Sequence, residues 1–473
     1  MGKKDFFKSL VGYSVPSYIG AAISLFSIPI LTRLFSTEEM GKINMFIAYS
    51  NILLVFCNMG YEQAFVRFCN EDKSHNSIGS WASLCMGISL IFTTFVVFGT
   101  LIFFKEISLA IYGDISIWCI IAIDLFLLAR VITQYTTLIS RMSQNVIEYS
   151  IQTIIITITT KIIFIVAAFW DPTFVIAVKI MVYSNLLLAI AFLLYFKSKK
   201  FFAVFVGVDK RLIGKLTKYS LPFVPTFFIS TANLYLSQLI LRKYVGFEAV
   251  GIYANAVSVA NVLSIVQSGF NAYWPAFVFA NYKTEQKNIQ HIHKFVVWAI
   301  TFFAMLAIAG QGILYIFVGN NFRESQLIFP LLIIVPAIYT FAETTRIGIR
   351  IAQKTYYELL VSVCSVGINV LLCFILIPKY SIIGAALSTV FSSIIGVYSA
   401  SIISNKYYQS VQSFIPMTLA ILILFIMACL NLIALGNSKY YYYILLFLAL
   451  FFTFKNQVIQ IFHYGYVQIR GSK

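Results

Sequence analysis

Charged side chains inside long apolar runs are the residues of this sequence most able to do chemistry. A charge at membrane depth costs roughly 3 kcal/mol, so by default it faces the interior of a helix bundle or a water-filled cavity. Some have simpler explanations: Arg67 and Arg346 stand near the ends of their runs and could extend to the membrane surface, and Glu62 could pair with Arg67. The candidates are Glu62, Arg67, Asp124, Arg130, Lys161, Lys179, Glu343 and Arg346.

Amide and hydroxyl side chains form a second pattern. Asn233 and Ser237 are four residues apart, as are Gln267 and Asn271, so in a helix each pair shares one face. Such stripes either hydrogen-bond neighbouring helices, as is common in membrane bundles, or line a cavity for a ligand with many hydroxyls, that is, a sugar. The residues in this pattern are Asn233, Ser237, Asn255, Asn261, Gln267 and Asn271.

The sequence carries no recognisable catalytic or metal-binding motif. The 4 histidines lie in expected loops or near the ends of apolar runs, and His291 and His293 beside Lys294 indicate a solvated loop rather than a zinc site. No phosphate-binding P-loop is present, and the 7 cysteines lack C-x-x-C spacing. We therefore predict a protein that uses no cofactor or metal and is neither an ATPase nor another enzyme.

Composition identifies the elements that must position these side chains as membrane helices. Hydrophobic residues make up 60% of the chain and charged residues 11%, with a mean hydropathy of +0.87, whereas about a quarter of a soluble domain is charged. The formal charge of +17 is spread over short loops between apolar runs. It forms no basic, aromatic-interleaved face, so nucleic-acid binding is excluded.

Run lengths predict an all-α integral membrane protein with about fourteen transmembrane helices, since a span needs about 20 mostly apolar residues. The N-terminal run is longer than the apolar part of a signal peptide, so we expect it to remain as the first helix. The expected spans are 10–34, 43–66, 78–104, 114–138, 147–169, 173–196, 218–241, 250–275, 294–318, 326–345, 356–378, 381–404, 413–435 and 439–463.

The loops between these spans predict the orientation. Lys and Arg accumulate on the cytoplasmic side of membrane proteins. With a cytoplasmic N-terminus, that side receives about three basic residues for each one on the opposite side. Both termini are therefore predicted to be cytoplasmic.

The chain is internally duplicated. Tyr13-Ser14-Val15-Pro16 opens the first apolar run, and Tyr219-Ser220-Leu221-Pro222 opens the seventh. Six spans separate them, so both enter the membrane from one side as parallel repeats, and prolines should interrupt the first helix of each. We expect a six-helix lobe at 1–196, a basic cytoplasmic link at 197–217, a second six-helix lobe at 218–404 and an extra helix pair with a tail at 405–473. After similar distances each copy also carries an arginine, an acid and a glycine: Arg33, Glu39 and Gly41, and Arg242, Glu248 and Gly251.

Short motifs along the whole chain resemble those of the Wzx-type polysaccharide flippases of bacteria, a branch of the superfamily that includes the MATE multidrug antiporters. Each motif is weak alone, and their order and spacing carry the resemblance. They are Pro29-x-Leu31-Thr32-Arg33, Glu39-Met40-Gly41, Gly60, Arg67, Gly251-Ile252-Tyr253-Ala254, Trp274-Pro275, Lys354-Thr355 and Ile377-Pro378-Lys379-Tyr380 with Gly384-Ala385-Ala386.

This resemblance implies a two-lobed transporter of the bacterial inner membrane that works by alternating access. The implied cargo is an undecaprenyl-diphosphate-linked oligosaccharide for O-antigen, capsule or another surface polysaccharide, and the implied partners are membrane lipid, a polymerase and a chain-length regulator. Glu62 and Asp124 are the acids expected to couple transport to an ion gradient. The basic residues expected to hold the anionic headgroup are Arg33, Arg67, Arg130, Lys161, Lys179 and Arg242.

Three other functions remain open. A peptidoglycan lipid-precursor flippase would share the fold and the lipid carrier. A MATE-type cation or multidrug antiporter needs acids in its cavity, whereas intramembrane Lys and Arg outnumber acids here. A glycosyltransferase or repeat-unit polymerase would be expected to carry a large extramembrane loop, and the longest loops here, the central link and about 276–293, do not resemble active sites.

Overall fold

The structure, a computed structural model, describes residues 3–69, 77–198, 210–354, 356–433 and 436–455. Throughout these residues the secondary structure is helical, without a strand. The chain divides into two compact units, Met1–Gly251 and Ile252–Lys473, which are described separately.

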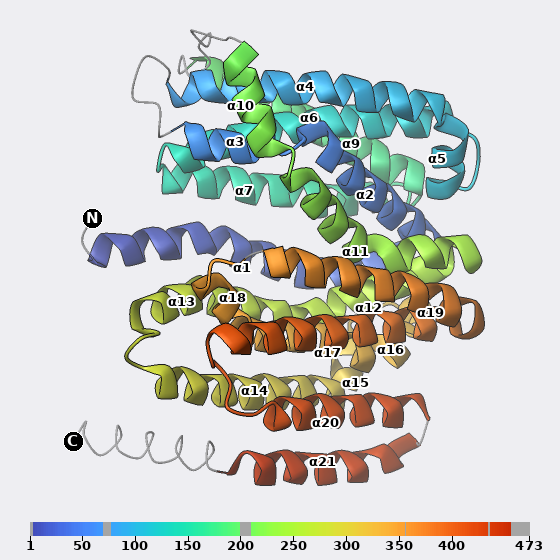
Figure 1. Cartoon of the computed structure of the whole chain (residues 1–473). Helices are drawn as coiled ribbons and strands as arrows, with labels where there is room; N and C mark the ends of the chain where they lie inside the picture. Colours follow the sequence, from blue (N-terminus) through green and yellow to red (C-terminus); the bar gives the residue numbers. More distant parts are fainter. Residues whose placement is uncertain (1–2, 70–76, 199–209, 355, 434–435, 456–473) are drawn as a thin grey trace, which may run out of the picture. The chain divides into compact units, whose positions relative to one another are not determined.

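Long apolar helices build the first unit, joined by short turns (Figure 1). Its centre is α6, which packs against α9, α4 and α2, while α1 packs against α7. The helices are α1 (Lys3–Leu34), α2 (Thr37–Asn58), α3 (Tyr61–Phe68), α4 (Ile78–Ile102), α5 (Phe104–Ile111), α6 (Ile117–Met142), α7 (Val146–Lys161), α8 (Ile163–Ala168), α9 (Phe174–Ser198), α10 (Lys210–Ser220), α11 (Phe223–Tyr244) and the beginning of α12 (Phe247–Ala260).

Capping side chains fix where several of these helices begin. Ser36 accepts a hydrogen bond from the backbone N–H of Glu39 at 3.2 Å, which caps α2. Asn145 caps α7 in the same way, through the N–H of Glu148 at 3.2 Å. Each cap satisfies a backbone donor that has no partner in the first turn.

The second unit is a bundle in which α17 packs against α14, α19 and α13, and α14 packs against α20. After the rest of α12 its helices are α13 (Ser264–Asn281), α14 (Gln286–Ala309), α15 (Gln311–Ile316), α16 (Ser325–Leu332), α17 (Ile334–Thr345), α18 (Ile347–Ile351), α19 (Tyr356–Tyr407), α20 (Ile415–Leu432) and α21 (Lys439–Thr453), with 3-10 turns at Asn261–Leu263, Asn320–Phe322 and Gly436–Ser438.

The described helices confirm the predicted fold class. Ten are long and apolar enough to cross a membrane. One of them, the 52-residue α19, is two helices joined at Ser381, where φ is 49° and ψ is −127°, which is the predicted turn between two spans. With α1, the consecutive pair α7 and α8, and α21, the described chain provides the expected set of about fourteen spans.

Two details of the sequence prediction are corrected. The first is that α1 runs unbroken from Lys3 to Leu34 past Pro16 and Pro29, so these prolines do not interrupt it. Pro222 does separate α10 from α11. The second is the predicted span 43–66, which is divided at Met59 and Gly60 into α2 and α3.

The compact first unit extends past the basic link as far as Gly251. The reason is that α10 packs on α3 and α11 packs on α2. The compact units are defined by packing, whereas the predicted repeats are defined by sequence. The repeat boundary near residue 197 therefore stays a prediction.

Candidate functional site

A polar pocket of about 330 Å3 lies inside the first unit, between α2, α3, α6 and α11. Amide, hydroxyl and carboxyl groups share its wall with apolar side chains. The lining residues are Asn51, Leu54, Val55, Asn58, Glu62, Gln134, Phe227, Ser230, Thr231, Leu234 and Tyr235.

Two amides on one face of α2 connect the pocket walls. Asn51 and Asn58 are seven residues apart, two helical turns, and therefore point the same way. The Asn51 side chain donates to the hydroxyl of Tyr235 on α11 at 3.0 Å. The Asn58 side chain donates to the amide oxygen of Gln134 on α6 at 2.9 Å. One polar stripe on α2 thus links two other helices.

The break between α2 and α3 places an acid in the pocket. Met59 and Gly60 adopt φ values of 47° and 75°, the left-handed conformation that ends α2. A Cβ on Gly60 would lie 2.5 Å from the carbonyl oxygen of Ser220 at the end of α10, so the helices approach each other too closely for a side chain. α3 then begins at Tyr61 and puts Glu62 into the wall.

The carboxyl of Glu62 is buried, with only 7% of the residue exposed. Its Oε2 atom has no hydrogen-bond partner within the described residues, and neither has the side-chain oxygen of Asn58. Leaving a buried acceptor unpaired costs free energy. These two oxygens in one pocket are available to a proton, a cation or a hydrogen-bond donor of a ligand.

Arg130 brings positive charge to the same region. It lies on α6 one turn before Gln134, is half-buried, and lies near the pocket residue Tyr235. The region therefore combines an acid, a guanidinium group, amides and hydroxyls, which together can bind a hydroxyl-rich ligand with ionised groups.

The other predicted acid has a different environment. Asp124 on α6 is buried at 7% exposure, and its Oδ1 accepts a hydrogen bond from Thr100 on α4 at 2.8 Å. It does not line the pocket. Its packing is that of a satisfied polar contact between two helices.

The remaining predicted basic residues of the first unit lie away from this pocket. Arg33 and Arg67 are exposed at the ends of α1 and α3. Lys161 donates to the hydroxyl of Ser24, and the Lys179 ammonium lies 5.6 Å from the centre of the Trp118 ring.

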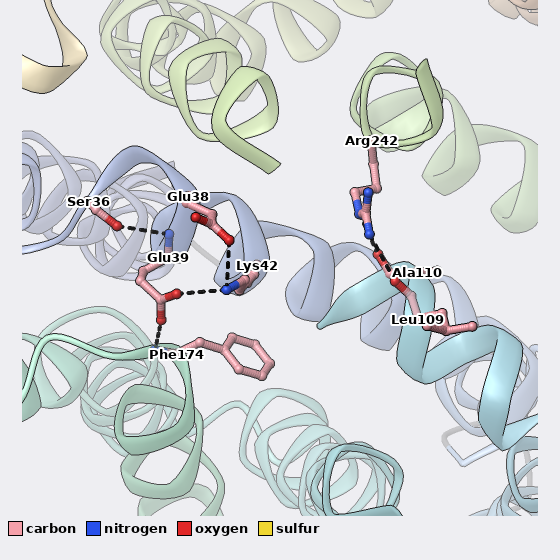
Figure 2. A network of polar contacts seen from close by, with 8 residues as sticks. All are labelled: Ser36, Glu38, Glu39, Lys42, Leu109, Ala110, Phe174 and Arg242. Atoms are coloured by element: carbon pink, nitrogen blue, oxygen red, sulfur yellow. Dashed lines mark hydrogen bonds and ion pairs between the residues drawn. The ribbon is translucent and has the colours of Figure 1, made fainter. Parts of the chain in front are cut away.

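Arg242, the sixth predicted basic residue, lies in the last turn of α11 and is half-buried. Its Nε donates to the carbonyl of Ala110 at 3.3 Å and its Nη2 to the carbonyl of Leu109 at 3.0 Å (Figure 2). Its guanidinium therefore ties α11 to the end of α5.

The predicted amide and hydroxyl stripes lie largely elsewhere. α11 faces the pocket through Ser230, Thr231 and Tyr235, whereas Asn233 and Ser237 do not line it. In the second unit, the Asn255 side chain donates to the hydroxyl of Ser325 at 2.8 Å. Gln267 is half-buried, and Asn261 and Asn271 are exposed.

Sequence reasoning missed the amides of the pocket. Asn51 and Asn58 stand seven residues apart in an apolar run, two helical turns, which places them on one face of a helix as the four-residue spacing does on later spans. Gln134 follows Arg130 by one turn. Treating uncharged amides in the second and fourth spans like those in the seventh and eighth would have found them.

Solved structures of membrane transporters share this fold. A structure titled "Lipid II flippase MurJ, inward closed conformation" is 16% identical with a TM-score of 0.69, and the match covers 96% of this chain and 99% of that one. A structure of the MATE multidrug transporter DinF-BH is 12% identical with a TM-score of 0.56, covering 86% and 97%. An inward-facing multidrug resistance MATE family transporter of the MOP superfamily is 12% identical with a TM-score of 0.54, covering 84% and 98%.

A comparison with curated proteins finds no significant match. A family model described as "Polysaccharide biosynthesis protein" matches residues 8–279, more than half of the 473 residues. The chain therefore belongs to the polysaccharide biosynthesis protein family, a family of flippases, as its motifs predicted, and it has the multi-pass membrane fold of the MurJ and MATE transporters.

Proposed function

We propose that the protein flips undecaprenyl-diphosphate-linked oligosaccharide repeat units from the cytoplasmic to the outer face of the bacterial inner membrane, for a surface polysaccharide such as O-antigen or capsule. The observation that carries the proposal is the polar pocket in the apolar first unit of a chain from a polysaccharide biosynthesis family. Both termini are cytoplasmic in this proposal, and the protein works by alternating access.

The pocket has the size and the chemistry of a sugar subsite. Ligand pockets run from about 300 to 1,000 Å3, so one of about 330 Å3 holds one or two sugar rings rather than a whole oligosaccharide. Asn51, Asn58 and Gln134 offer amide donors and acceptors, which match sugar hydroxyls. Ser230 and Thr231 add hydroxyls from α11.

Among the basic residues Arg130 is best placed for the diphosphate. The guanidinium of Arg242 already donates to two carbonyls, and Lys161 already donates to Ser24. Arg130 is half-buried beside the pocket residue Tyr235, where a guanidinium group can form paired hydrogen bonds with phosphate oxygens. The undecaprenyl tail stays in the bilayer, since each buried CH2 contributes about 0.8 kcal/mol.

Glu62 is the acid we propose for ion coupling. Its buried Oε2 atom has no hydrogen-bond partner among the described residues, so a proton or a cation can bind there when the pocket is empty of cargo. A repeat-unit polymerase and a chain-length regulator would then act on the flipped product.

The test is the fate of lipid-linked oligosaccharide in cells lacking the protein. We expect surface polysaccharide to disappear and intact repeat units to accumulate on the cytoplasmic leaflet. Arg130→Ala and Asn58→Leu should fail to restore export, whereas Arg33→Ala, at an exposed residue that does not line the pocket, should restore it.

Other outcomes would assign the protein differently. Loss of viability with trapped peptidoglycan precursor indicates a lipid II flippase. Repeat units that cross but stay unpolymerised indicate a polymerase. Normal surface polysaccharide with new sensitivity to cationic dyes indicates an antiporter.

A further inference from the structure

Within the first unit, the first turns of α2 and α12 meet without side chains between them. A Cβ on Gly41 would lie 1.9 Å from the carbonyl oxygen of Phe247, and a Cβ on Gly251 would lie 2.0 Å from that of Thr37. Real Cβ atoms do not approach other atoms this closely. Only glycine fits at both positions, and the two backbones are in direct contact.

The contact is reciprocal. Thr37 begins α2 and Gly41 follows four residues later; Phe247 begins α12 and Gly251 follows four residues later. The two pairs occupy similar positions in the two predicted sequence repeats. The glycine of each helix meets the first carbonyl of the other, as in the isologous interface of a symmetric dimer. On α2, Thr37 and Gly41 are small residues four apart, a pattern that lets membrane helices approach closely, whereas on α12 Gly251 follows the large Phe247.

Polar contacts surround the α2 side of this crossing. The Thr37 hydroxyl lies 3.3 Å from Oε1 of Glu248. Lys42 forms ion pairs with Glu38 at 3.0 Å and Glu39 at 2.9 Å. Glu39 also accepts a hydrogen bond from the backbone N–H of Phe174, which holds the start of α2 against the start of α9 (Figure 2).

Arg242 fixes the α12 side. Its guanidinium carbon lies 3.7 Å from the centre of the Phe247 ring while its N–H groups donate to Leu109 and Ala110. One side chain therefore stacks on the first residue of α12. It also holds the end of α5 through Leu109 and Ala110 (Figure 2). The turn into α12 is fixed in place next to the start of α2.

We propose that this crossing, defined as Thr37, Gly41, Phe247 and Gly251, is the outer gate of the transporter. The proposal rests on the proposed function and its orientation, in which the turns α1–α2 and α11–α12 both face outward. The gate is closed in this structure. α2 and α12 must separate there before cargo can leave on the outer side.

The contact suits a gate because it contains no interlocking side chains. Two glycines and two carbonyls can part without any rotamer change. The ion pairs of Lys42 lie within α2 and need not break when the two helices part, whereas the hydrogen bond from Thr37 to Glu248 must break. The close fit nevertheless excludes water while it lasts.

The first test measures access to the pocket from outside. The full-length protein carries Thr231→Cys as a reporter, with the exposed Cys364 replaced by serine, and cells are treated with a membrane-impermeant maleimide. Gly41→Ala and Gly251→Ala should each raise the labelling rate by roughly tenfold or more, because a methyl group cannot fit in the closed contact. Gly87→Ala, where an added Cβ meets no atom within 4 Å, should leave the rate unchanged.

A second test holds the crossing shut. Thr37→Cys with Glu248→Cys, joined by a short reducible crosslinker, should abolish outer labelling, and a reductant should restore it. Ile117→Cys with Ile121→Cys joins two exposed positions on α6 alone and should change nothing. Unchanged labelling in folded glycine variants, or labelling that persists in the crosslinked protein, overturns the gate. Both readouts report access to the pocket rather than transport of cargo. If the gate variants behave as expected but cells lacking the protein keep normal surface polysaccharide, the gate stands and only the proposed function is contradicted.

Discussion

At the scale of single residues, two buried acids that look alike in sequence prove different in structure. Asp124 accepts a hydrogen bond from Thr100, whereas Oε2 of Glu62 has no partner among the described residues. A charge in an apolar run signals function only when its surroundings leave it unsatisfied. We therefore expect transport to depend on Glu62 much more than on Asp124.

Glu62→Gln should reduce oligosaccharide export by roughly tenfold or more while the protein still folds, because a neutral amide removes the ionisable group and breaks no contact of Oε2. Asp124→Asn keeps an oxygen that accepts from Thr100 and should export nearly normally. Export in complemented cells and the Tm of the purified variants test this pair. The reverse ranking, with Asp124→Asn inactive and Glu62→Gln active, would contradict it.

The sequence predicts those residues of the site whose type is unusual in an apolar run. Glu62 was found because a carboxyl in an apolar run is conspicuous. Asn51 and Gln134 were missed because an amide in such a run is ordinary, and only packing decides that it faces Tyr235 or Asn58 in a pocket. Asn233 was favoured on spacing, yet the rotation of α11 brings Ser230 and Thr231 to the pocket instead.

At the scale of elements, run lengths predicted the helices well but not where they break. The apolar run 43–66 carries no proline, so its division at Met59 and Gly60 had no strong signal. Pro16 and Pro29 gave a strong signal and yet α1 continues through them. Apolar content measures whether a segment enters the membrane, whereas a break depends on what packs beside it.

Gly60→Ala should destabilise the protein by about 2 kcal/mol or more, because it adds left-handed backbone strain to a contact with the Ser220 carbonyl that has no room for a methyl group. Thermal unfolding of the purified protein measures the loss. Gly99→Ala, which lies within α4 and has open space around the added methyl group, is the control for the same substitution without the contact. Equal Tm values for the two variants would show that α10 does not press on this break.

Arg242→Ala should lower stability by about 1–3 kcal/mol through the loss of charge-assisted hydrogen bonds to the end of α5. Arg242→Lys should recover only part of it, since an ammonium cannot both stack on Phe247 and donate in the same fork. Lys105→Ala, an exposed charge on α5, serves as the control for a change of net charge. A Tm for Arg242→Ala as high as that of the control would remove Arg242 from this role.

At the scale of the whole molecule, the sequence predicted an all-helical membrane protein, and the described helices confirm that prediction. The internal duplication stays a prediction. Their orientation in the membrane rests on loop charge alone. A fluorescent protein fused after Lys473 should fluoresce and an alkaline phosphatase fused there should be inactive, because both report a cytoplasmic terminus. An active phosphatase at that end would invert the proposed orientation and place the Gly41–Gly251 crossing on the cytoplasmic side.

The reciprocal fit of Gly41 and Gly251 bears on how such a chain could arise. A surface that matches its own copy does not need a covalent link, so a half-length ancestor could have made the same contact as a homodimer before its gene was duplicated and fused. Once the halves are fused, the backbone of each repeat limits the space available to the glycine of the other. A larger residue in place of either glycine would clash with the backbone of the other repeat. The two repeats can therefore diverge in sequence at neighbouring positions but must keep both glycines.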